Sequence, residues 1–73
     1  MENKKSLEIS GRLLYPLSIG TVAFIDEGDG LRKTSTVVSM EAVSQTDVRF
    51  ETLYTHYLLH LEEERVGVQV ERN

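Results

Sequence analysis

The sequence predicts an all-β protein, a small antiparallel SH3-like barrel of five or six short strands. Three observations support this prediction: apolar residues alternate with polar ones in several short runs, turns containing glycine or polar residues separate the runs, and the 73 residues make one domain at most. A period of two is typical of strands with one buried face, and closely spaced short strands are typical of small barrels. We expect a single domain over 1–73, with 1–5 as a flexible N-terminal end.

The first half of the chain predicts one strand followed by a hairpin. Apolar residues alternate with glutamate and serine over 6–10, which indicates a strand that we expect at an edge of the sheet. Residues 21–27 and 31–40 contain many β-branched side chains, and these fit a pleated surface. Asp29-Gly30 between the two runs suits a turn that needs a positive φ. We therefore predict a hairpin, with Phe24 in the core.

A half-buried strand and a break follow in the second half. Val48 and Phe50 alternate with charged residues, so we expect Phe50 in the core. Beyond Phe50, the apolar positions change from even to odd numbers. A period of two cannot slip by one residue without turning its core face outward, so we expect a bulge or tight turn near Thr52–Thr55. Alternating valines over 66–70 predict a closing strand, which is the second expected edge of the sheet.

The segment 54–65 has two interpretations. Its leucines and glutamates are good helix formers, so one alternative is an antiparallel sheet with one helix around 54–65. Three glutamates near the C-terminal end would oppose the dipole of such a helix. The β-branched and aromatic residues of 50–57 favour a strand. We predict the strand and keep the helix as the alternative.

His56 and His60 form a candidate metal site only on a helix. Residues four apart on a helix have Cβ atoms roughly 5–6 Å apart, so both imidazoles could bind one zinc ion. Four residues along a strand span roughly 13 Å, which is too far for one ion. The strand interpretation therefore predicts two solvent-facing histidines, no metal and no cofactor.

Two other groups of residues are candidates for binding. Arg32 and Lys33 lie among serines and threonines and could contact phosphates, helped by Lys4 and Lys5. The net charge of −4 opposes general binding to nucleic acid. Among the tyrosines, Tyr15 and Tyr54 are the two candidates for gripping a peptide, because the ring is rigid and amphipathic.

The sequence contains no catalytic signature. It has no cysteine and no G-x-S-x-G elbow, and "GDGLRKT" lacks the spacing of a phosphate-binding loop. We expect a non-enzymatic interaction module that binds another protein or itself by pairing at a strand edge. The alternatives are a nucleic-acid-binding regulator using Arg32 and Lys33, and a metal-binding protein using His56 and His60. No run is apolar enough to cross a membrane, so we expect a cytoplasmic protein. Its composition and size are typical of a bacterial or phage accessory protein.

Overall fold

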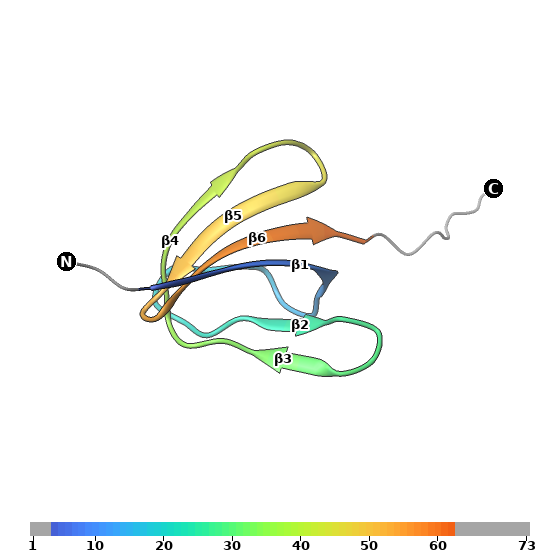
Figure 1. Ribbon diagram of the computed structural model, residues 1–73, viewed down its shortest axis with the longest axis horizontal. Coiled ribbons are helices and arrows are strands. Elements are labelled where there is room, and N and C mark those ends of the chain that lie inside the picture. Colours follow the sequence, from blue (N-terminus) through green and yellow to red (C-terminus); the bar gives the residue numbers. More distant parts are fainter. Residues whose placement is uncertain (1–3, 63–73) are drawn as a thin grey trace.

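The computed structural model describes residues 4–62, and this part of the chain is all-β with no helix (Figure 1). The predicted fold class is confirmed at this level. The described residues also contain no helix with the length and apolar character that a membrane crossing needs. The strands are β1 Lys5–Leu13, β2 Phe24–Asp26, β3 Leu31–Lys33, β4 Val37–Ala42, β5 Asp47–Thr52 and β6 Thr55–Leu61.

The six strands form one sheet in the order β3-β2-β1-β6-β5-β4, and the sheet is not closed. Neighbouring strands are antiparallel, except that β1 and β6 are parallel, in register from Lys5 opposite Thr55 to Gly11 opposite Leu61. The prediction of a purely antiparallel sheet was therefore wrong at this pair. The prediction that 6–10 is an edge was also wrong, because β1 lies in the middle and pairs on both sides. An alternating pattern reports a buried face, and it does not distinguish a central strand from an edge strand.

The predicted hairpin is present, but both of its strands are shorter than the expected 21–27 and 31–40. β2 pairs with β3, from Phe24 opposite Lys33 to Asp26 opposite Leu31. The positive φ of this turn is found at Gly28, at 93°, and not at Gly30. The run 31–40 is divided because Thr34 binds back to Ala23. The Thr34 N–H donates to the Ala23 carbonyl at 2.9 Å, and the Ala23 N–H donates to the Thr34 hydroxyl at 3.0 Å.

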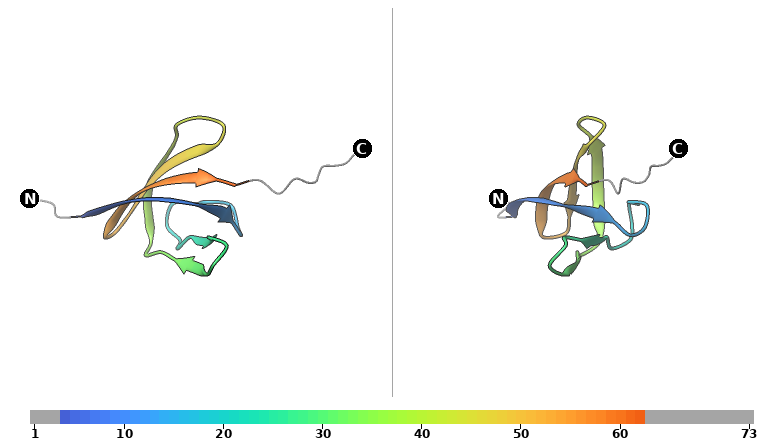
Figure 2. Two further views of the ribbon diagram at one scale, coloured as in Figure 1. Left: turned by 45° about the vertical axis from the view of Figure 1, so that its right-hand side comes forward. Right: turned by 90° about the vertical axis from the view of Figure 1, so that its right-hand side faces the viewer.

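A bridge of backbone hydrogen bonds bends the sheet at this break. The Gly20 N–H donates to the Val37 carbonyl, and the Val37 N–H donates to the Thr21 carbonyl, both at 2.8 Å. The Leu53 N–H donates to the Thr36 carbonyl at 3.1 Å. The chain therefore runs directly from β3, at one edge of the sheet, to β4, at the other edge. Figure 2 shows the resulting bend between the β2–β3 hairpin and the β4–β5 hairpin.

The core lies on the inner face of this bend. Phe50 and Tyr57 are opposite each other on β5 and β6, and their rings stack with centroids 4.7 Å apart. The prediction for Phe50 is confirmed. The prediction for Phe24 was wrong, because its neighbour Ile25 points inward while Phe24 is half-buried. The buried apolar residues are Ala23, Ile25, Val37, Phe50, Tyr57 and Leu59.

The predicted turn and the strand after it are both confirmed. β5 ends at Thr52 and β6 begins at Thr55, where the pattern changes from even to odd numbers. The helix alternative for 54–65 was wrong over the described residues, since β6 runs to Leu61. The predicted closing strand 66–70 lies outside the described residues.

Gly11 allows the central strand β1 to lie close to β2. A Cβ atom at this position would be 2.7 Å from the Asp26 carbonyl oxygen and 2.8 Å from a methyl group of Ile25. Because one of these neighbours is backbone, little room is available for relief. The close approach of β1 and β2 therefore requires glycine here.

We expect Gly11→Ala to lower the free energy of unfolding by about 1–3 kcal/mol, because overpacking must displace β2. Gly30→Ala is the matched control, since a Cβ atom at Gly30 would have no neighbour within 4 Å. We expect the control to change stability by less than about 1 kcal/mol. Urea denaturation of both variants measures the difference, and equal stabilities would contradict this account of β1–β2 packing.

Candidate functional site

An apolar groove of about 450 Å³ opens beside β4. Its volume is within the usual range for ligand sites, roughly 300–1,000 Å³. Six apolar residues line it, together with the polar residues Glu41, Ser44, Gln45 and Asp47. We call it the β4 groove, and its apolar residues are Leu13, Leu17, Met40, Ala42, Val48 and Leu61.

The β4 groove continues the inner face of the sheet beyond the core. Met40 and Ala42 are register partners of Phe50 and Val48, so their side chains share the face of the core residue Phe50. Leu13 and Leu61, at the ends of β1 and β6, extend the same apolar surface. Among the described strands, β4 has no neighbour on its outer side, and the Met40 side chain is therefore 45% exposed.

The backbone of β4 also has hydrogen-bonding groups directed to this open side. The Val43 N–H donates to the Asp47 carbonyl at 3.0 Å, so Val43 faces β5. The backbone groups of successive strand residues point to alternate sides of the strand. The N–H and C=O groups of Glu41 therefore also point to β5, and those of Met40 and Ala42 point outward. Within residues 4–62 these groups have no backbone partner, and such a row is a template for an additional strand.

The opposite edge of the sheet, β3, is less suited to pairing. It has only three residues, and two of them are Arg32 and Lys33. Short length and positive charge are common means of preventing an edge strand from pairing. The contrast between the two edges favours β4 as the binding edge.

Arg32 takes part in contacts that support the fold. It lies opposite the buried Ile25, and its guanidinium forms an ion pair with the Glu27 carboxylate. The hydrogen bond from Arg32 to Glu27 raises the pKa of Arg32, and the Tyr57 hydroxyl contributes to the same shift. Arg32 therefore links the β2–β3 hairpin to β6 across the inner face.

The four basic residues of the predicted phosphate patch do not form one surface. The ammonium group of Lys4 pairs with Glu51, lowers the pKa of this carboxyl, and also donates to the Thr52 carbonyl at 2.9 Å. Lys5 lies at the N-terminal end of β1. Lys33 is opposite Phe24, and Phe24 is next to Ile25, which pairs with the C-terminal end of β1. Lys5 and Lys33 are both exposed, but they belong to opposite ends of β1.

The two tyrosines of the predicted peptide grip are exposed but separate. Tyr15 is 65% exposed and Tyr54 is 70% exposed. Tyr15 follows the C-terminal end of β1 and packs against Phe24 in a T-shaped arrangement, with ring centroids 5.9 Å apart. Tyr54 precedes Thr55, which pairs with the N-terminal end of β1. The structure therefore does not bring the two rings together.

The two histidines lie on one strand and do not share a metal site. β6 places His56 opposite Ser6 and His60 opposite Ser10. Within residues 4–62, no three histidine, aspartate or glutamate side chains are grouped so that they could hold an ion. The metal hypothesis required a helix, so it loses its geometric basis.

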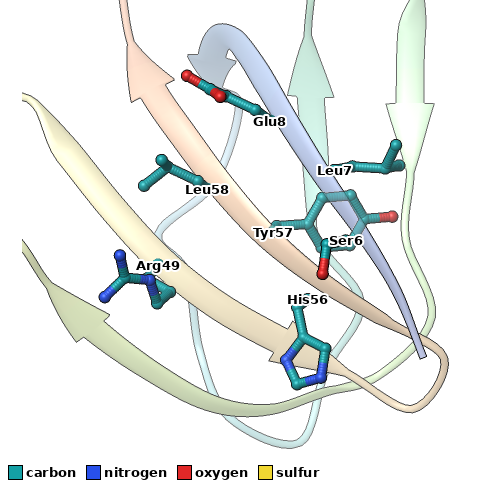
Figure 3. Close-up of a pocket in the computed structure, with 7 residues that line it drawn as sticks. All are labelled: Ser6, Leu7, Glu8, Arg49, His56, Tyr57 and Leu58. Atoms are coloured by element: carbon teal, nitrogen blue, oxygen red, sulfur yellow. The ribbon is translucent and has the colours of Figure 1, made fainter. Parts of the chain in front are cut away.

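A second, smaller hollow of about 320 Å³ lies on the outer face (Figure 3). It is lined by the side chains of Ser6, Glu8, Arg49, His56 and Leu58, from three adjacent strands. Leu7 and Tyr57 complete its lining, and none of the three strands is an edge of the sheet. The β4 groove is therefore the better candidate site.

Sequence reasoning missed the residues of the β4 groove. The alternation of Met40 and Ala42 with Glu41 was visible, but it indicates only a strand with one apolar face. Their importance comes from the position of β4 at the end of the sheet. No protein-family model, curated protein or solved structure matches the chain.

We expect Arg32→Met to lower the free energy of unfolding by about 0.5–1 kcal/mol, because it leaves Glu27 without its partner at a partly exposed position. Lys33→Met removes the same charge from the next residue, which is exposed. We expect this control to have wild-type stability. Thermal unfolding of both variants decides the matter, and equal stabilities would contradict a structural role for Arg32.

Proposed function

We propose that the protein is a small, non-enzymatic interaction module that binds an extended protein segment as an additional strand at β4. The observation that carries this proposal is that the edge of β4 at Met40 and Ala42, which has no backbone partner among the described residues, adjoins the β4 groove. Backbone groups at Met40 and Ala42 would form main-chain hydrogen bonds to the added strand. Alternate side chains of that strand would extend over the groove, which is how strand addition combines affinity with selectivity.

The partner that we propose is β4 of a second copy of the chain. An antiparallel pair centred on Met40 sets Glu41 of each copy opposite Ser39 of the other. No two like charges then lie directly opposite each other, which is a condition for a stable pair. Each copy supplies the same patch, so the interface has two-fold symmetry and closes on itself. The exposed side chains of Met40 and Val38, at 45% and 41%, would be covered.

The finer fold and the location are also proposals. We infer a relation to SH3-like barrels from the six short strands and the strong bend of the sheet. The parallel pairing of β1 with β6 counts against this relation. The cytoplasmic location and the bacterial or phage origin remain predictions from composition.

We expect the wild-type protein to form a dimer as its concentration rises, and Ala42→Pro to weaken this association at least tenfold. Proline removes the outward N–H of Ala42, and an edge position tolerates it because no bond within the sheet is lost. Lys33→Pro is the matched control at the other edge of the sheet. The Thr34 N–H points to the chain before β2, so the N–H of its neighbour Lys33 points outward. Sedimentation equilibrium measures all three proteins.

The control should associate like the wild type. If Ala42→Pro does not fold, Met40→Lys replaces it, because a charge at this half-exposed position should also oppose pairing. A wild-type protein that stays monomeric at millimolar concentration, or equal weakening by the change at β3, would contradict pairing through β4.

A further inference from the structure

His60 connects three adjacent strands on the outer face of the sheet. Its Nε2 atom is 2.6 Å from a carboxylate oxygen of Glu8 on β1, and its Nδ1 atom is 2.8 Å from a carboxylate oxygen of Asp47 on β5. The imidazole therefore lies between two carboxylates, with one ring nitrogen directed to each.

This geometry requires a charged imidazole. Ionised carboxylates only accept hydrogen bonds, and a neutral imidazole has only one N–H to donate. Both contacts can be hydrogen bonds only when His60 carries two protons. The hydrogen bond to Glu8 raises the pKa of His60 above its usual 6.5, and the one to Asp47 acts in the same direction.

Asp47 also holds the turn that borders the β4 groove. Its carbonyl accepts the N–H groups of Val43 at 3.0 Å and Ser44 at 3.2 Å, and its own N–H donates to the Ser44 hydroxyl at 3.1 Å. The Leu61 N–H donates to the Thr46 carbonyl at 2.7 Å. The Thr46 hydroxyl lies 3.5 Å from the carboxylate oxygen of Asp47 that contacts His60, which couples the Asp47 side chain to the turn 43–46. Ser44 and Gln45 of this turn line the groove.

We propose that His60 is a proton-controlled clasp that fixes the turn 43–46 and with it the shape of the β4 groove. When His60 loses a proton, one of its two carboxylates loses a hydrogen-bond donor, and the turn loosens. Glu8 and Asp47 are the charged groups that face the ring. Arg12 lies four residues beyond Glu8 on β1, Arg49 lies two residues beyond Asp47 on β5, and Glu62 follows the end of β6. The consequence for binding rests on the proposed function, whereas the response of the turn does not.

The direction of the pH effect follows from the raised pKa. A group whose pKa is higher in the folded state stabilises the fold fully below its unfolded value of about 6.5. This contribution is lost as the pH rises through the folded value. The turn should therefore be held firmly in mild acid and should loosen at alkaline pH.

The test is an NMR titration of the full chain in a His56→Gln background, which leaves His60 as the one histidine. We expect the His60 ring to titrate above 6.5. The Val43 and Ser44 amides should shift with the same midpoint and lose protection from exchange beyond it. Asp47→Asn should lower the midpoint and abolish the response of the turn. Glu62→Gln is the matched control and should change neither.

A His60 midpoint at or below 6.5, or turn amides that do not follow the ring, would overturn the clasp. Sedimentation on either side of the midpoint separates the two proposals. Tighter association in mild acid, abolished in His60→Gln, supports both. A monomer at every pH with a turn that still follows His60 defeats the proposed dimer and leaves the clasp standing.

Discussion

The backbone bridge between residues 20–23 and 34–37 determines the shape of this protein. Without such a bend, an open sheet of six short strands would leave its apolar face in contact with water. The bridge folds the two hairpins towards each other, and Val37, whose N–H and C=O groups both bind the segment 20–21, is completely buried. Most of the core depends on this fold, because Ile25 comes from one side of the bend and Phe50 and Leu59 come from the other.

The same bend explains why the candidate site lies at β4. β4 begins at the bridge and forms the edge of the sheet opposite to β3. Its apolar side chains share the inner face with Phe50, but there is no further strand beside them among the described residues. The apolar groove and the outward backbone groups of Met40 and Ala42 are therefore two consequences of one topological position.

Local features of the fold were predictable from the sequence, and long-range ones were not. The change of parity after Phe50 located the turn before Thr55, and the β-branched and aromatic residues of 50–57 indicated the strand that contains the two histidines. The parallel pairing of β1 with β6 was not predictable, because alternation contains no information about the neighbouring strand. The contact of Arg32 with Tyr57 was not predictable for a similar reason: Glu27 lies in the same hairpin as Arg32, whereas Tyr57 on β6 comes close only in the folded sheet. The β4 groove depends on strand order, and it could not be located before that order was known.

Amide hydrogen exchange along β4, measured over a range of protein concentrations, tests the central claim most directly. The account predicts that at low concentration the amides of Met40 and Ala42 exchange rapidly, while that of Glu41, which faces β5, is protected. As the concentration rises, Met40 and Ala42 should become protected as well. Strong protection of Met40 and Ala42 at the lowest concentration would show that their edge is already paired within one chain, and it would contradict the open edge on which the proposed function depends.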